Sequence, residues 1–236
     1  KSPRWAFKDR KGPVYGKVVH EYTREQLNQM SEEEIYQHIV EDLYVNAFEE
    51  QVKTQSLYKG QGLAEGLEHT LMVCPCCQRV NKMKTLGNKI HCICVFSAEY
   101  GEDGWFHGEN LPYSNTLEWS HFQKKWLKEH AGKLREQLSE PIMALSNSDL
   151  TVFTGKRKNI VMTGQEIHFF GDRIEIGHSQ NLHVFYLDKI KKMGVFRNTR
   201  VFITYEDGFY ELTRFDGIGG IKFFTLWRIL TGKPLY

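Results

Sequence analysis

All five cysteines of the chain lie in one short segment, residues 74–94. Cys74 and Cys77 form a Cys-x-x-Cys pair, and Cys92 and Cys94 form a Cys-x-Cys pair after fourteen intervening residues. Two close pairs of thiols at such a separation are typical of tetrahedral metal sites, because each tight turn supplies two ligands. The pattern therefore predicts a zinc site that consists of these four cysteines.

The second pair departs from the usual ribbon repeat, which is Cys-x-x-Cys. His91 stands three residues before Cys94, so it is an alternative ligand to Cys92, and Cys76 is a spare thiol inside the first pair. We favour four thiolates, since neighbouring thiolates outcompete a single imidazole for zinc. Because four protein ligands fill the coordination shell, the zinc is expected to be structural and to leave no position for a substrate or water.

Disulfides and buried free thiols are the alternatives to a metal. Two disulfides leave one cysteine over, and nothing else in the sequence points to secretion. A metal site is therefore the favoured interpretation of the cysteine spacing.

The residues around the cysteines predict short strands. "RVNKMKTLGNKIH" predicts two strands that reverse at Gly87 and Asn88, and "VFSAEY" and "WFHG" flank the turn "GEDG" as two more. Together with the cysteines, these strands indicate a zinc ribbon over residues 67–113.

Strand and helix signals precede the predicted ribbon. "VYGKVVHEYT" is rich in β-branched and aromatic residues and predicts a strand. Thr23-x-x-Gln26 and Ser31-x-x-Glu34 fit capping boxes, and each predicts the start of a helix. Apolar residues recur at helical spacing after the second box, so that helix is expected to reach about Gln51.

A second amphipathic helix is predicted after the ribbon, within residues 114–145, where it connects the ribbon to the C-terminal part of the chain. Its apolar stripe contains Trp119, Phe122, Trp126, Leu134 and Leu138. A stripe of this kind usually packs in a core, so we assign it no ligand.

From about Asp149 the pattern changes to short strands separated by turns. Some seven strands are expected, followed by an apolar helix that ends before Gly232. Over residues 146–236 this order resembles a pleckstrin-homology or GRAM-type module, a small barrel or bent sandwich with a C-terminal helix. Such modules often bind lipid headgroups or protein segments, and a module that only packs is the alternative. The chain as a whole is expected to belong to the α+β class.

The composition narrows the classes of partner. The chain has 31 basic and 29 acidic residues, a net charge of +2, which is too balanced for a protein whose main function is to bind polyanions. No nucleic-acid partner is therefore expected. No apolar run approaches the ~18–20 residues that a membrane-spanning helix needs.

The order of the segments carries a resemblance to a known family. "PRWAFKDRKGPVYGKVVHEYT", "MSEEEIYQHIVEDLYVNAFEEQ", "YKGQGLAEGLEHTLMVCPCC" and "DGWFHGENLPYSN" follow one another in the chain. This succession resembles the bacterial 1-acyl-sn-glycerol-3-phosphate acyltransferase-like family of lysophospholipid acyltransferases, in the longer form with a C-terminal extension. The likeness covers residues 1 to about 130 well and the remainder loosely.

The resemblance implies a place for each part of the chain. Residues 1–66 would be the last strand and helix of the acyltransferase domain, and the ribbon, connecting helix and β-rich module would be the extension. The parent enzyme of phospholipid biosynthesis would move an acyl chain from a thioester carrier to lysophosphatidate. The chain would contact the upstream acyltransferase domain and be cytoplasmic, peripheral to the inner face of the cell membrane.

The family's chemistry rests on a His-x-x-x-x-Asp motif, which the resemblance places before Lys1, so this chain alone is expected to be non-catalytic. His183 and Asp188 match the spacing, but residues five apart in a strand point to opposite faces. His38 and Asp42 lie four apart on a predicted helix and suit a surface pair. We therefore assign no catalytic residue and no substrate-binding residue.

A stand-alone adaptor is the second hypothesis. In it, the ribbon and the pleckstrin-homology-like module bind a protein or a nucleic acid; a basic ribbon face would favour it, and "QRVNKMK" is only mildly basic. A separate question concerns "KSPRWAFKDRK", where Trp5 and Phe7 stand among basic residues. That mixture suits an anionic lipid surface, and a solvated loop or a segment that has lost its packing partner is the alternative.

Overall fold

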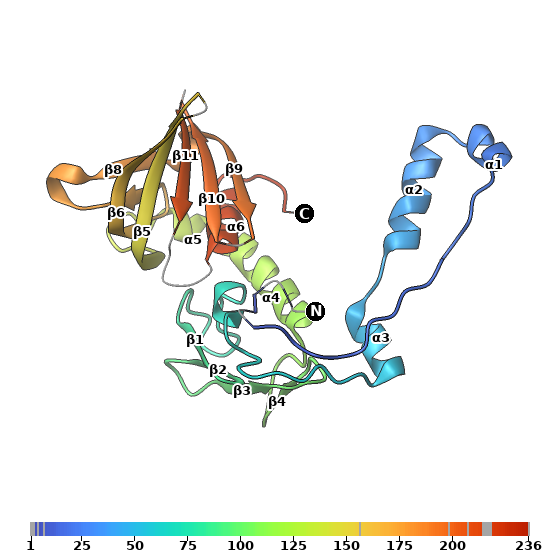
Figure 1. The fold of residues 1–236 in the computed structure, drawn as a ribbon. Helices are drawn as coiled ribbons and strands as arrows, with labels where there is room; N and C mark the ends of the chain where they lie inside the picture. The colour runs from blue at the N-terminus through green and yellow to red at the C-terminus, as the bar shows by residue number, and fades with distance from the viewer. Residues whose placement is uncertain are drawn as a thin grey trace.

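The computed structural model describes residues 3, 5, 6, 8–155, 157–197, 199–206, 208–213 and 219–235. An extended arm, residues 13–57, projects from one side of the molecule (Figure 1). The described residues from 58 onward form a body that carries two β-sheets and the remaining helices. A bridge between the backbones of Lys11 and Lys59 closes the base of the arm.

The arm contains three helices, and both predicted capping boxes are present. The helices are α1 (Arg24–Gln29), α2 (Glu32–Leu43) and α3 (Ala47–Thr54). Thr23 and Ser31 accept hydrogen bonds from the backbone N–H groups of Gln26 and Glu34, and the latter two side chains accept from the cap N–H groups in return. The helix starts were therefore readable from the sequence.

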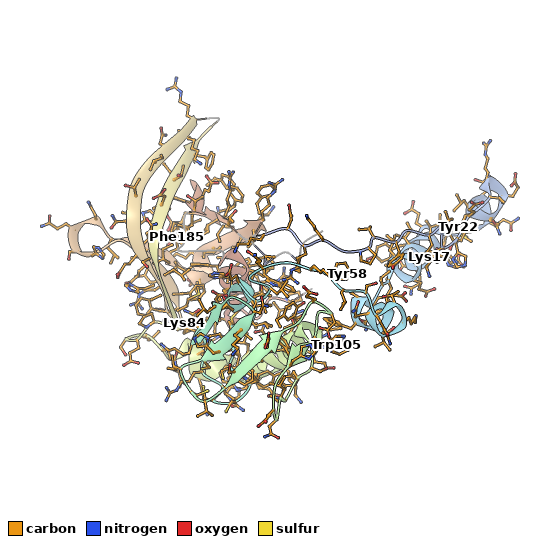
Figure 2. All side chains as sticks on the ribbon, turned by 60° about the horizontal axis from the view of Figure 1, so that its bottom comes forward. Lys17, Tyr22, Tyr58, Lys84, Trp105 and Phe185 are labelled. Atoms are coloured by element: carbon orange, nitrogen blue, oxygen red, sulfur yellow. The ribbon has the colours of Figure 1, made fainter. Side chains whose placement is uncertain are left out.

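Two other expectations for the arm are wrong. The helix expected to continue from Ser31 to about Gln51 ends at Leu43, and a new helix begins at Ala47. Residues 14–23, expected as a strand, are extended but pair with no strand in the described part of the chain. A strand is stabilised by bonds to a neighbouring strand, and Lys17 and Tyr22 lie away from both sheets (Figure 2).

The arm leaves its apolar side chains uncovered. No residue of α1 or α2 is buried. Twelve large apolar side chains in the arm have exposed fractions between 45 and 75%: Val14, Tyr15, Val18, Val19, Tyr36, Ile39, Val40, Leu43, Tyr44, Val45, Val52 and Leu57. Within the arm, Asp42 accepts hydrogen bonds from Tyr22 (2.7 Å) and His20 (2.5 Å), and the Tyr22 ring lies beside the His20 and His38 rings.

The first sheet of the body follows a short 3₁₀ turn, η1 (Leu67–His69). It is antiparallel with the order β1-β2-β3-β4, and its strands are β1 (Met83–Leu86), β2 (Lys89–Cys92), β3 (Ser97–Tyr100) and β4 (Phe106–His107). The turn between β1 and β2 falls at Gly87, whose φ of 59° is the left-handed conformation that glycine adopts at least cost. All four strands expected for the ribbon are present.

The connecting helix is divided in two, α4 (Thr116–Glu129) and α5 (Ala131–Arg135). Trp119 and Leu134 of the predicted stripe are buried, and Phe122 and Trp126 are partly buried. Leu138 is the exception, because the helix ends before it and its side chain is exposed.

The second sheet has seven antiparallel strands in the order β8-β7-β6-β5-β11-β10-β9, curled into a half-barrel (Figure 1). The strands are β5 (Met143–Thr154), β6 (Arg157–Phe169), β7 (Arg173–Ile176), β8 (His183–Tyr186), β9 (Ile190–Phe196), β10 (Arg200–Tyr205) and β11 (Gly208–Thr213). Two 3₁₀ turns flank β8, η2 (Ser179–Asn181) and η3 (Leu187–Lys189). Helix α6 (Gly220–Leu230) packs against β9 and β10.

Two hydrophobic cores stabilise the body. The smaller core lies against the first sheet and includes Leu71 and Cys74 from the segment before it and Trp119 from α4. The larger lies between the second sheet and α6, yet it also contains Met72 and Val73, which immediately precede the first cysteine. The two sheets are therefore parts of one packed unit. None of the helices in the described ranges is long and apolar enough to span a bilayer.

Candidate metal centre

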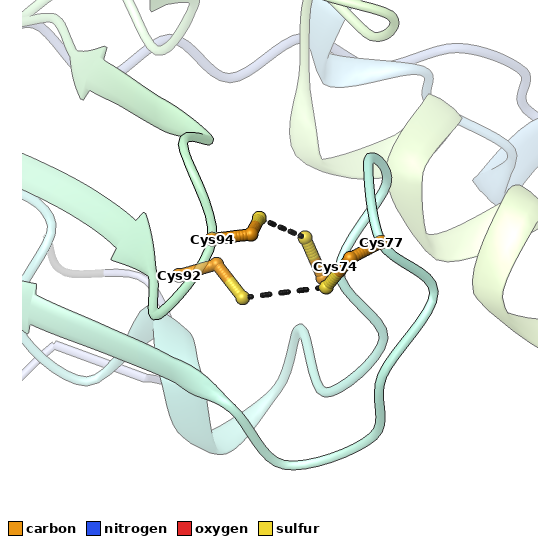
Figure 3. Close-up of side chains that lie close together, drawn as sticks. All are labelled: Cys74, Cys77, Cys92 and Cys94. Carbon is orange, nitrogen blue, oxygen red and sulfur yellow. Dashed lines mark hydrogen bonds between the residues drawn. The ribbon is translucent and has the colours of Figure 1, made fainter.

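Four cysteine sulfurs meet at one end of the first sheet (Figure 3). The Sγ atoms of Cys74 and Cys94 are 3.7 Å apart, as are those of Cys77 and Cys92, and all four lie within 4.8 Å of one another. A disulfide needs about 2.05 Å, whereas four thiolates at about 2.3 Å from a central metal ion lie about 3.8 Å from each other. The sulfurs are too far apart for disulfides and close enough together to bind one metal ion.

Local backbone geometry brings each pair into position. The Cys74 carbonyl accepts a hydrogen bond from the Gln78 N–H at 3.0 Å, which closes a tight turn around the first pair, and Gln78 has a left-handed φ of 59°. At the second pair, Cys92 ends β2, and its N–H donates to the Phe96 carbonyl at 3.0 Å. The Phe96 N–H in turn donates to Cys94 Sγ at 3.5 Å.

The electrostatic environment of the thiols differs across the cluster. Burial raises the pKa of the Cys74 and Cys92 thiols, whereas the hydrogen bond from the Phe96 N–H lowers the pKa of Cys94 to about 7. Buried thiolates are costly unless a cation compensates their charge. A metal ion bound by all four sulfurs supplies that compensation, so the cluster can hold a metal ion.

The two alternative ligands lie outside the cluster. Cys76 is exposed and does not belong to the group of four. His91 is next to Cys92 on β2, and neighbouring residues of a strand point to opposite faces. Ile90 and Cys92 are both buried, which places His91 on the other face. The structure thus brings together the four cysteines that the sequence analysis favoured.

Helix α4 holds the chain that leads into the first cysteine pair. Trp119 donates a hydrogen bond from Nε1 to the Val73 carbonyl at 2.8 Å. Gln123 accepts from the Met72 N–H and donates to the Thr70 carbonyl, each at 2.9 Å. Sequence reasoning missed Gln123, although a polar residue one turn after Trp119 on an apolar stripe is a signal for a buried polar contact.

A buried lysine joins the metal-binding segment to the second sheet's helix. Lys222 of α6 is almost fully buried, and its Nζ donates to Asn81 Oδ1 at 2.5 Å. Burial lowers the pKa of Lys222 to about 8, although the charge of Glu68 opposes that shift. Burial likewise lowers the pKa of the neighbouring His69 to about 4. Sequence reasoning missed this contact, because residues 141 apart in the chain carry no local pattern.

The two histidine–aspartate pairs with suggestive spacing are not arranged for catalysis. The His183 ring packs against Phe185 and Tyr210, with ring centroids 4.6 and 5.3 Å apart, while Asp188 lies in the turn η3. His38 makes no hydrogen bond with Asp42, although its charge adds to the effect of the Tyr22 hydrogen bond that lowers the pKa of that carboxyl. Its ring lies beside Tyr22, whose hydroxyl donates to Asp42.

The N-terminal stretch that suited a lipid surface is partly engaged by the body. Trp5 packs edge-on against Tyr100 at 5.9 Å, and the Arg10 guanidinium lies over both rings. Arg10 is itself buried and donates to the Leu63 carbonyl at 2.5 Å. Phe7 lies outside the described residues. Trp5 and Arg10 therefore pack on the body of the same chain, which neither the lipid-surface interpretation nor its alternatives, a solvated loop or a lost packing partner, predicted for these two residues.

The chain was also compared with known proteins. No protein-family model matches it, and no curated protein matches its sequence.

Proposed function

We propose that this chain is the C-terminal region of a lysophospholipid acyltransferase, in which a separate catalytic domain packs against the arm. The body would be a non-catalytic extension that a zinc ion stabilises. Acyl transfer from a thioester to lysophosphatidate would take place on the partner domain.

The exposed apolar surface of the arm is the observation that carries the proposal. Ten of its twelve uncovered apolar side chains lie on α2, directly after α2, and on the extended segment before α1. Surfaces of this kind, when contiguous, usually mark a protein interface. The extended segment also has backbone groups that could complete the edge of a neighbouring sheet, as the resemblance implies for a last strand and helix.

The donor set supports zinc as the metal. Four thiolates in a tetrahedron favour Zn²⁺, since the soft sulfur ligands select against Mg²⁺ and Ca²⁺. The filled shell leaves no open position, so the ion would stabilise the first sheet without taking part in acyl transfer.

The second sheet supports a pleckstrin-homology-type assignment. Its first strand, β5, pairs with its last, β11, and the C-terminal helix α6 lies in the larger core. Strands β5 to β8 form one meander and β9 to β11 form another, and the two meanders are joined where β5 pairs with β11. This arrangement, followed by a helix, is expected for such a module.

An activity comparison tests the proposal. Acyl transfer from a thioester donor to lysophosphatidate is measured for the full-length gene product and for this chain alone. We expect turnover only in the full-length protein. There, Val18→Asp and Leu43→Asp should lower activity at least tenfold, because each places a charge in the interface with the catalytic domain.

Leu86→Asp is the matched control, because Leu86 is similarly exposed but lies on the first sheet of the body. It should leave acyl transfer unchanged. A full-length protein without acyl transfer would rule out the proposal and leave the adaptor hypothesis. Full activity in both arm variants would show that the arm is not the interface.

A further inference from the structure

A row of phenylalanines crosses the outer face of the second sheet, the face turned away from α6. The phenylalanine row consists of Phe153 on β5, Phe209 on β11, Phe202 on β10 and Phe196 on β9. Side chains alternate along each strand, and the intervening residues such as Val201, Ile203 and Leu212 are buried in the core with α6. The row therefore lies on the solvent side of the half-barrel.

The members of the row are neighbours across the strands. Phe153 is paired with Phe209, and their ring centroids are 5.2 Å apart. Phe202 stacks on Phe209 at 5.7 Å with an interplanar angle of 2°. Phe209 and Phe196 are 40 and 50% exposed. Ile160 on β6 extends the apolar surface beyond Phe153 and is 63% exposed.

Cationic side chains border the row at both ends. Lys158 is the cross-strand partner of Phe153, and Arg200 is the partner of Phe196. Both contact the carboxylate of Glu211, at 2.6 and 3.6 Å, while about half of each cationic side chain stays exposed. The Glu211 side chain is 1% exposed, so its charge is covered by these neighbours.

Two further cations add positive charge without an ion-pair partner among the described residues. Arg197 lies over the Phe196 ring at 5.3 Å, and Lys192 is exposed on the same face of β9. This face thus holds four cations and two buried carboxylates, Glu211 and Asp149, so it carries a net positive charge beside exposed hydrocarbon.

We propose that this outer face is a docking surface for an anionic phospholipid bilayer. Phe196, Phe209 and Ile160 would enter the headgroup region, and Lys158, Lys192, Arg197 and Arg200 would contact lipid phosphates. Cations attract anionic leaflets, and apolar side chains add the energy of leaving water. The inference does not depend on the acyltransferase proposal, because it rests on this face alone.

Single-stranded nucleic acid is the other polyanion that aromatic and basic residues can bind. It requires open ring faces on which bases stack. Here Phe202 and Phe209 stack on each other, and Arg197 and Arg200 lie over Phe196. Ring or guanidinium neighbours thus already lie against Phe196, Phe202 and Phe209, whereas the exposed ring edges and aliphatic side chains can still contact lipid.

Vesicle binding of the whole chain tests the inference. Co-sedimentation is measured with vesicles of phosphatidylcholine containing phosphatidylglycerol and with vesicles of phosphatidylcholine alone. We expect binding only to the anionic vesicles, and weaker binding as salt rises. Each of Lys192→Gln and Arg197→Gln should weaken it on the order of fivefold, and the double variant about 25-fold. Phe196→Ser should weaken it further.

Matched variants separate this face from other surfaces. Lys128→Gln on α4, Leu86→Ser on the first sheet and Leu43→Ser on the arm change similarly exposed residues elsewhere. They should leave vesicle binding unchanged. The proposal would be overturned if Lys192→Gln, Arg197→Gln and Phe196→Ser left vesicle binding unchanged. It would also be overturned if a control variant weakened binding as much as they do. Equal binding to neutral vesicles, or binding to an oligonucleotide with none to vesicles, would likewise overturn it.

Discussion

Helices α2 and α4 carry the same kind of sequence signal but have different surroundings. Each starts with a side-chain cap and shows an amphipathic pattern. In α4 the stripe is buried, with Trp119, Gln123 and Leu127 inside, whereas no residue of α2 is buried. An amphipathic pattern thus specifies which face of a helix will be covered, and it does not specify what covers it.

The largest expected effect comes from removing the metal site, which should affect the body and spare the arm. Cys77→Ser should abolish binding of one zinc per chain and disorder the first sheet, since structural zinc sites contribute on the order of 10 kcal/mol. Metal analysis and the near-ultraviolet circular dichroism of Trp119 measure this. Cys76→Ser is the control, because Cys76 lies outside the cluster. Loss of zinc in that control would contradict the assigned ligands.

A matched pair of leucine truncations should give the next largest effect. Leu127→Ala in α4 removes a fully buried side chain and should cost about 2–5 kcal/mol of the free energy of unfolding. Leu43→Ala in α2 removes a 75% exposed one and should change it by less than about 0.5 kcal/mol. Urea unfolding measures both. Equal costs would show that α2 is packed in solution and that the two helices do not differ in their surroundings.

Because Lys222 is buried, the free energy of unfolding of the body should depend on pH. The pKa of Lys222 is lowered to about 8 from 10.5, so between these values the unfolded chain binds more protons than the folded one. Stability should therefore rise as pH increases from about 8 to 10.5, by roughly 1–3 kcal/mol from this residue. Lys222→Met should remove that rise.

The comparison of Lys222→Met with the unchanged chain isolates this residue from other groups that titrate in the same range. Glu68, His69 and Asn81 surround the amine in both proteins. Thermal unfolding of both proteins at pH 7, 8.5 and 10 is the measurement. Parallel profiles would show that Lys222 is solvated and that the two sheets are joined more loosely than its burial indicates.

The smallest effects should come from the helix caps. Ser31→Ala should destabilise α2 by about 1 kcal/mol, and only locally, because α2 is not packed. Asn115 caps α4 through the Leu117 and Glu118 N–H groups and is buried, so Asn115→Ala should lower global stability instead. Amide hydrogen exchange separates the two cases. If Ser31→Ala also reduced the protection of amides in the body, the stability of the arm and that of the body would be coupled, contrary to this expectation.

Features that depend on neighbouring residues were predictable from the sequence. The capping boxes at Thr23 and Ser31, the reversal at Gly87 and the four-cysteine cluster all rest on short spacings. The seven strands followed by a helix were likewise expected from turns and alternation.

Features that depend on contacts between distant residues could not be predicted from the sequence. The segment from Val14 to Thr23 has strand composition, but whether it forms a strand depends on a neighbour that its sequence does not encode. The Lys222–Asn81 bond and the covered Glu211 arise when remote parts of the chain meet. Their residue types alone suggest solvated charges.

The chain between Leu71 and Cys74 has a consequence for how the protein can be divided. Leu71 and Cys74 point into one core, while Met72 and Val73 between them point into the other. A fragment that ends after the connecting helix would expose Met72, Val73 and Leu127, and a fragment with the second sheet alone would lose the residues that cover it. Recombination or truncation between residues 67 and 146 would therefore yield insoluble halves. The part of the chain whose removal would expose least of either core is the stretch that holds α1 and α2, in which no helical residue is buried. The cysteine site and the half-barrel therefore have to be engineered together.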